Sequence, residues 1–186
     1  MDAGWKKLPD MNTERSGLGV AVGDGKTVCC WWGRGGLGVA VGDGKLFAVG
    51  GHDGNDELKS GEYLDLKNVG AGWKKLPDMD AERNGSRDEN DLKSGEHLDL
   101  KNVDAGWKKI PDMNTERSCL GVAVGDGKLF AVGGYGDGYL KSGEYLDLKK
   151  MDAGWTKLPD MNTERRHLGV AVGDGWGWQT VCCWWE

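Results

Sequence analysis

Five cysteines and three histidines are the residues of this sequence best suited to binding a metal ion or to redox chemistry. Four of the cysteines form adjacent pairs, Cys29 with Cys30 and Cys182 with Cys183, and the fifth is Cys119. Adjacent cysteines rarely bind one ion together, and no Cys-x-x-Cys motif or nearby pair of histidines completes a ligand shell. The cysteine pattern therefore predicts neither a metal site nor a spaced disulfide framework.

The histidines and the glycine-rich turns point the same way. His52, His97 and His167 fall at different positions of an internal repeat, so they predict no symmetric metal ring, and His52 is expected in a surface loop. The recurring Gly-Asp-Gly-Lys string lacks the spacing and the following Ser or Thr of a phosphate-binding loop, and we interpret it as a hairpin turn. We expect no catalytic residue, no metal and no cofactor.

Charge and hydropathy restrict the partners. Asp and Glu number 30 against 24 Lys and Arg, which gives a net charge of -6 and does not favour phosphate binding. No apolar run approaches the roughly 20 residues that cross a bilayer, and residues 1–10 are too polar for a signal peptide. We therefore expect no nucleic-acid or membrane partner and a cytoplasmic location.

The cysteine pairs belong to a string, Thr-Val-Cys-Cys-Trp-Trp, that occurs at Thr27–Trp32 and again at Thr180–Trp185. Each copy follows a Gly-Asp-Gly turn where other repeats continue as Lys-Leu-Phe-Ala-Val-Gly-Gly. A DNA sequence can encode Lys-Leu-Phe-Ala-Val-Gly-Gly. One extra adenine after its lysine codon shifts the reading frame, and the same DNA then encodes Lys-Thr-Val-Cys-Cys-Trp-Trp. We interpret both segments as out-of-frame copies of a second strand, without a selected role for their cysteines and tryptophans.

An internal repeat must position every candidate residue. The string Gly-Trp-x-Lys-x-Pro-Asp-Met contains Trp5, Trp73, Trp107 and Trp155. The unit between the last two is whole and predicts four strands, at residues 120–124, 128–132, 143–148 and 154–161. Asp-Gly supplies the tight turn between the first two strands, and helical periodicity is absent. The sequence predicts an all-β fold built from four-stranded antiparallel meanders, the pattern of a propeller blade.

These residues resemble the kelch repeats. The matching features are Arg117, the string at 121–134, the acidic Glu144 before the third strand, and Trp155 with the Leu-Pro-Asp-Met that follows it. The same set recurs at 37–79. The chain departs from the family in one respect, since Leu-Asp stands where kelch repeats usually have Tyr-Asp; this occurs at Leu64, Leu98 and Leu146.

The resemblance implies a β-propeller that binds proteins. It suggests a substrate-recognition subunit of a cullin-RING ubiquitin ligase, with an actin-associated scaffold as the alternative and a sugar-processing or oxidase enzyme as a third. A copper oxidase would need two histidines and tyrosinate ligands near the axis, whereas Tyr63 and Tyr145 occupy equivalent strand positions that favour packing. We therefore expect a binding protein and not an enzyme.

The units are not all complete. We expect residues 37–79 and 114–161 each to form a complete kelch-like blade, and 80–113 to hold a half blade with only the last two strands. We expect residues 1–36 to form a partial blade with an out-of-frame-like insert, and 162–186 a partial blade with an out-of-frame-like tail. Propellers close with about 4 to 8 blades, so we expect an open propeller, a fragment of a longer kelch protein, that can self-associate through its blade edges.

The variable loops are the expected binding site. In a four-stranded meander, the loop between strands two and three emerges on the same side as the loop from strand four into the next unit. The Arg of each Glu-Arg loop either pairs internally with an acidic residue of a neighbouring blade or joins a protein- or peptide-binding surface. The candidate partner-binding residues are Arg15, His52, Asp53, Asn55, Asp56, Arg83, Arg117, Tyr135, Asp137, Tyr139 and Arg165.

Overall fold

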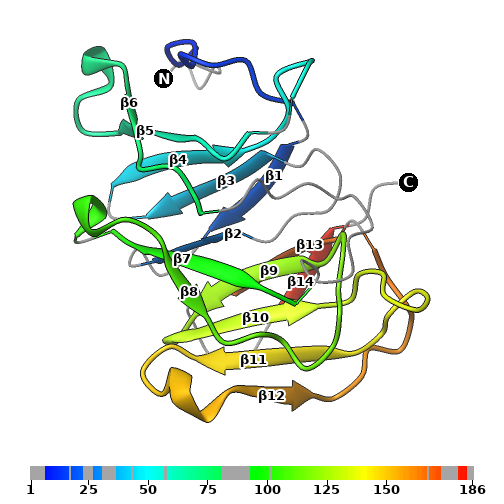
Figure 1. Ribbon diagram of the computed structural model, residues 1–186. Helices are drawn as coiled ribbons and strands as arrows, with labels where there is room; N and C mark the ends of the chain where they lie inside the picture. Colours follow the sequence, from blue (N-terminus) through cyan, green and yellow to red (C-terminus); the bar gives the residue numbers. More distant parts are fainter. Residues whose placement is uncertain are drawn as a thin grey trace, which may run out of the picture.

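The computed structural model describes residues 7–16, 18–22, 27–30, 37–42, 44–56, 58–80, 93–100, 102–166, 168–172 and 180–183 (Figure 1). The described residues form strands and three short 3₁₀ turns, η1 (Val69–Ala71), η2 (Val103–Ala105) and η3 (Met151–Ala153), without an α-helix. The predicted all-β class is confirmed. No helix among these residues is long and apolar enough to cross a membrane.

Two sheets contain the complete units. The first contains β3 (Leu37–Gly42), β4 (Lys45–Gly50), β5 (Gly61–Asp65) and β6 (Trp73–Lys75), and the second contains β9 (Gly121–Gly125), β10 (Lys128–Val132), β11 (Gly143–Asp147) and β12 (Trp155–Leu158). Both are antiparallel meanders with the same register, because Ala48 faces Glu62 in one and Ala131 faces Glu144 in the other. Asp126 and Gly127 turn β9 into β10 with positive φ angles of 50° and 67°, as a two-residue type I′ turn requires.

The half unit pairs with a strand from elsewhere in the chain. β7 (Gly95–Asp99) pairs with β8 (Lys108–Ile110), and β2 (Thr27–Cys30) joins the other side of β7 in antiparallel orientation. A third strand without its second leaves backbone donors and acceptors open, and β2 satisfies them from a distant part of the chain.

The duplicated first strand also takes part in a sheet. β1 (Leu18–Val22) lies parallel to β3, residue for residue, with Leu18 opposite Leu37 and Val22 opposite Val41. The first complete unit is therefore five-stranded. At the other end of the chain, β13 (Gly169–Val172) pairs antiparallel with β14 (Thr180–Cys183). Both Thr-Val-Cys-Cys segments thus form strands, consistent with their interpretation as copies of a second strand.

The core lies between successive sheets. Figure 1 shows the β2–β7–β8 sheet between the two complete units, and hydrophobic clusters fill both of its contacts. The leucines that replace the usual Tyr of Tyr-Asp, Leu64, Leu98 and Leu146, are fully buried. Burying a leucine side chain contributes about 2 kcal/mol to the free energy of unfolding, so these positions remain part of the packed core although the tyrosine of the kelch pattern is replaced.

Candidate protein-binding site

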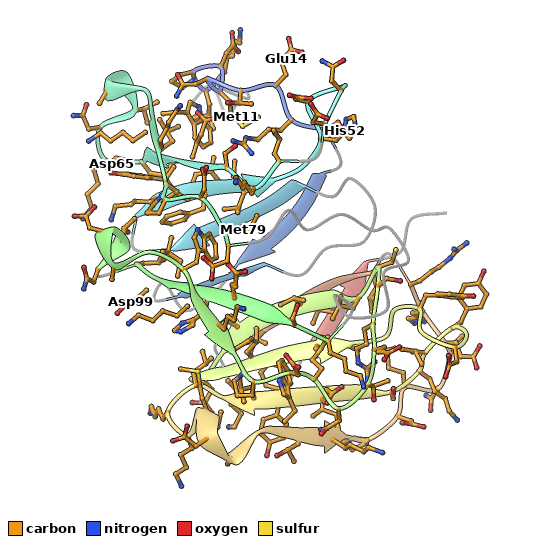
Figure 2. All side chains as sticks on the ribbon, viewed as in Figure 1. Met11, Glu14, His52, Asp65, Met79 and Asp99 are labelled. Atoms are coloured by element: carbon orange, nitrogen blue, oxygen red, sulfur yellow. The ribbon has the colours of Figure 1, made fainter. Side chains whose placement is uncertain are left out.

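The two variable loops of each complete unit lie side by side, as predicted. The incoming segment of the first unit contacts the loop after β4, since Ser16 N donates to His52 O at 3.0 Å. In the second unit, Ser118 and Tyr135 exchange backbone hydrogen bonds of 2.8 Å in both directions. Figure 2 shows Glu14 and His52, one from each segment, near the same end of the β3–β6 sheet, and Asp65 near the other end. Loops from consecutive parts of the repeat therefore form one surface.

Arg117 is buried beneath that surface. Its side chain is 1% exposed, and Nε lies 3.2 Å from Glu144 Oε1. Its terminal nitrogens donate to Gly133 O at 2.9 Å, Ser142 O at 2.8 Å and Ser142 Oγ at 2.9 Å. The Arg117 guanidinium is therefore enclosed by its own unit and offers no atoms to a partner. It is paired internally, but with an acidic residue of the same unit and not, as considered from the sequence, of a neighbouring blade.

Arg15 occupies the equivalent position in the segment that enters the first complete unit. Its side chain is fully buried, and it donates to Gly50 O, Ser60 O and Ser60 Oγ and pairs with Glu62 at 3.4 Å. Burial lowers the pKa of Arg15 from its ordinary value, and the Glu62 carboxylate opposes that shift. Arg15 Nε is buried without a hydrogen-bond partner in the structure, so this pair is less complete than that of Arg117. Arg15 is likewise removed from the candidate surface.

The glutamates of these pairs are held from a second side. Asn114 donates to Glu144 Oε2 through its backbone and its side chain, each at 3.0 Å, and Thr115 N donates to Oε1 at 3.2 Å. Around Glu62, burial raises the pKa, but hydrogen bonds from Asn12 and the charge of Arg15 outweigh it and the net pKa is lowered. The Asn-Thr-Glu-Arg segment thus fixes each incoming loop to the third strand of the unit it enters.

The repeated tryptophans connect each unit to the one before it. Nε1 of Trp73, Trp107 and Trp155 donates to the backbone oxygen of Pro9, Pro77 and Pro111, at 2.9, 3.0 and 2.8 Å. In the sequence these tryptophans mark the repeat, and Trp155 is also one of the features that resemble kelch repeats. The available signal was that Trp and Pro recur together in each copy of the string, since each tryptophan bonds the proline of the preceding copy.

An aromatic pair stands exposed on the loops of the second complete unit. Tyr135 and Tyr139 are 41% and 50% exposed, and their rings meet edge to face with centroids 5.7 Å apart. The Arg166 guanidinium carbon lies 4.9 Å from the Tyr139 ring centroid, within cation–π range. Asp137 is exposed in the same loop. The structure thus brings together both predicted tyrosines and Arg166, an arginine that was not among the residues selected from the sequence.

Backbone hydrogen bonds hold this surface in place. Arg165 O accepts from Gly134 N at 2.7 Å, and Arg165 N donates to Leu140 O at 3.1 Å. The segment carrying Arg166 is thereby fixed beside the tyrosines. Arg166 follows the repeated Arg where Ser16, Asn84 and Ser118 stand in the other three copies, so a charged residue at this position distinguished it in the sequence.

The corresponding loop of the first unit is polar. Asp53 Oδ1 accepts from Asn55 N at 2.9 Å and Asp56 N at 2.8 Å, and these bonds, that of Asp56 first, lower the pKa of Asp53. Gly54 N donates to His52 Nδ1 at 2.8 Å. His52 takes the place that Tyr135 has in the other unit, because each contacts the Ser before a first strand. The backbone of this loop is fixed, and Asn55 and Asp56 are exposed.

The remaining predicted residues differ in placement. Arg165 is partly exposed, and Arg83 and His167 lie outside the described residues. His97 lies within β7, opposite Lys108 in register, and burial together with the Lys108 charge lowers its pKa. No group of three or more His, Cys, Asp or Glu in the described ranges is arranged to hold a metal ion.

Comparisons with known proteins find a repeat motif in the sequence and a similar fold among solved structures. The kelch motif matches residues 33–80 and 116–162, together just over half of the chain. A solved structure described as "Structure of YjhT" is similar with a TM-score of 0.60 and 13% identity, covering 90% of this chain and 72% of that one. At that identity the likeness shows the fold alone, a kelch-repeat propeller. No curated protein matches the sequence.

Proposed function

The chain belongs to the kelch-motif family, whose repeats generally mediate protein–protein interaction, and on that premise we propose that its loop surface binds a protein or peptide. We further propose that it belongs to a substrate-recognition subunit of a ubiquitin ligase. The reaction would then be carried out elsewhere, and this chain would supply recognition without a catalytic step.

The observation that supports the proposal is the exposed group of Tyr135, Tyr139 and Arg166. Tyr and Arg are the side chains, along with Trp, that most often dominate binding energy at interfaces. Their loops are already ordered by backbone hydrogen bonds, such as the two between Ser118 and Tyr135, so a partner does not have to order them on binding. Asp137 adds a hydrogen-bond acceptor beside the rings. A partner with an aromatic or apolar anchor and a flanking acidic group fits this chemistry.

Site-specific photo-crosslinking tests the surface. A photoreactive amino acid replaces Tyr139 in one variant and Lys157, an exposed residue of β12, in the control. The proposal expects one protein to crosslink through position 139 and not through position 157. Equal crosslinking at both positions, or none at 139, contradicts it.

The identity of the recovered proteins tests the finer assignment. Co-precipitation of a cullin with the chain supports the ligase role. Co-sedimentation with actin filaments, without a cullin, supports the alternative of an actin-associated scaffold. Bound metal together with substrate turnover would favour the enzyme that we considered third.

A further inference from the structure

Two copies of the same pair of strands are arranged differently in this chain. β1 and β13 share the sequence Gly-Val-Ala-Val, and β2 and β14 share Thr-Val-Cys-Cys. In the later copy, β13 pairs antiparallel with β14. In the earlier copy, β1 pairs with β3 and β2 pairs with β7, so the two consecutive strands are apart. These strand sequences therefore form two different arrangements within one molecule.

The register of a β1–β2 hairpin follows from two other hairpins of the chain. Val170 of β13 lies opposite Cys182, the first cysteine of β14. In the second complete unit, Val122 lies opposite Ala131 across a Gly-Asp-Gly-Lys turn, and residues 23–26 repeat that turn sequence between β1 and β2. Both comparisons place Cys29 opposite Val20.

β1 has an edge that can accept β2. Among the strands that the structure describes, β3 is the one hydrogen-bonded neighbour of β1 in its sheet. The backbone groups along the other edge of β1 have no strand partner in that part of the chain, and an edge of this kind is a template for further pairing. β2 can therefore add to β1 while β1 stays on β3.

β7 is held in place independently of β2. Its other edge pairs with β8, and Leu98 is buried in a cluster with Phe47 and Trp107. The Glu96 carboxylate accepts a hydrogen bond from Asp80 N at 3.2 Å. β7 therefore keeps its packing and one sheet partner when β2 leaves it.

The two arrangements of β2 are matched in strand pairing. Each pairs all four residues of β2, with residues 96–99 on β7 or, in the hairpin register, with 19–22 on β1. The hairpin closes a short turn, whereas β7 is distant in the sequence, so the hairpin costs less chain entropy. The structure nonetheless has β2 on β7, so the other contacts of that sheet offset the entropy. Opposing contributions of this kind allow two populated states.

We propose that β2 is a switch strand with two alternative partners, the edge of β7 and the free edge of β1. In the first state β2 joins the half unit, as it does in the structure. In the second state it forms a hairpin with β1 and uncovers the edge of β7 at Gly95–Asp99. The exchange decides whether the half unit is tied to the strands that precede the first complete unit, and whether the β7 edge is open to solvent.

Disulfide trapping detects both states in the full 186-residue chain, in which Ser replaces every cysteine except Cys29. Directly opposite residues of an antiparallel pair have Cα atoms about 4.5–5.5 Å apart, which is within disulfide range. His97→Cys then reports β2 on β7, because His97 lies opposite Cys29, and Val20→Cys reports β2 on β1. Oxidation by glutathione disulfide in native buffer should form both intramolecular links, which proteolysis and mass spectrometry identify.

Two controls separate the hairpin from random collision. Ala21→Cys places a cysteine opposite Val28 instead of Cys29 in the hairpin register, so it should link at least about tenfold more slowly than Val20→Cys. A chain that keeps Cys182 alone and carries Val170→Cys sets the oxidation conditions, because these two residues already lie opposite each other.

Hydrogen exchange shows whether the β7 edge is uncovered. After oxidation, the amides of Gly95–Asp99 in the Val20→Cys chain should exchange at least about tenfold faster than in the His97→Cys chain, because β2 no longer covers them. Amides of β10 and β11 should be equally protected in both chains, which shows that both remain folded. Absence of either Cys29 disulfide, equal linking by Val20→Cys and Ala21→Cys, or equal protection of β7 in the two oxidised chains would overturn the proposal.

Discussion

Replacing Arg117 by Met tests how much the buried ion pair stabilises its unit. Methionine keeps an apolar side chain of similar length and removes the donors to Glu144, Gly133 O, Ser142 O and Ser142 Oγ. Glu144, whose side chain is 1% exposed, would then remain buried as a carboxylate that accepts hydrogen bonds from Asn114 and Thr115 but has lost its ion pair. Removing one partner of a buried pair costs about 3–5 kcal/mol, against about 5–15 kcal/mol for the stability of a whole domain.

Hydrogen exchange measured by mass spectrometry is the appropriate assay, because a repeat array can open one unit at a time. At about 1.4 kcal/mol per factor of ten, amides of β10 and β11 in the Arg117→Met chain should exchange more than about 100-fold faster. Amides of β4 and β5, in the other complete unit, serve as the internal reference. Adding Glu144→Gln should restore part of the protection, since no uncompensated charge then remains buried.

Arg165→Met is the matched control, because Arg165 has the same repeat position and no carboxylate among the described residues pairs with it. We expect its effect on stability to stay within about 0.5 kcal/mol. A loss below about 1 kcal/mol for Arg117→Met, or an equal loss for Arg165→Met, would show that the ion pair does not stabilise the unit.

Four further predictions follow from the packing. Gly133→Val should lower the melting temperature strongly, since Gly133 has a φ of +64° and an added Cβ would lie 2.5 Å from Arg165 O. The control Gly138→Ala should be tolerated, because a Cβ at Gly138 would have no atom within 4 Å, and an unchanged melting temperature for Gly133→Val would contradict the prediction. The pKa of Glu62 is lower in the folded protein than its ordinary value of 4.5, so the ionised carboxylate stabilises the fold above pH 4.5, and this stability is lost as pH falls through the folded pKa. Glu62→Gln should therefore make the stability less dependent on pH between those two pKa values, and an acid-denaturation curve identical to that of the unaltered chain would contradict this. Trp155→Phe removes the donor to Pro111 O and should cost roughly 1 kcal/mol or more in urea denaturation, whereas no measurable change would show the bond to be without net value. The chain should self-associate through open edges in size-exclusion chromatography with light scattering, and less so with Lys-Leu-Phe-Ala-Val-Gly-Gly restored at both Thr-Val-Cys-Cys-Trp-Trp segments; a sharp monomer peak for the original chain would refute this.

The order of strands within a unit was predictable because turn residues and β-rich runs are local signals. The pairing of β2 with β7 was not, since the open edge of β7 is created by residues missing from another repeat, and no local pattern in Thr27–Cys30 names its partner. The parallel alignment of β1 with β3 was not predictable either. Both strands have the sequence of a first strand, and a unit has one place for such a strand, so no local pattern shows where the second copy lies.

The candidate site was predictable to a similar degree. Strand alternation placed the loops of His52 and Tyr135 beside the incoming segments, as the structure shows. Whether an Arg of the repeat is buried depends on a carboxylate 27 residues or more away, as for Arg117 and Glu144, so the sequence left two possibilities open. Arg166 was not selected from the sequence, because its role depends on its position over the Tyr139 ring, which only the folded structure shows.

The tryptophan contacts between units give assembly a direction during synthesis. In all three, the proline acceptor precedes its tryptophan donor, by 64, 30 and 44 residues. At about 5–20 residues per second, the ribosome adds each tryptophan roughly 2 to 13 seconds after its proline acceptor. A nascent chain therefore always docks a new unit onto one already translated, and a pause between a proline and its tryptophan prolongs the time for which that acceptor waits.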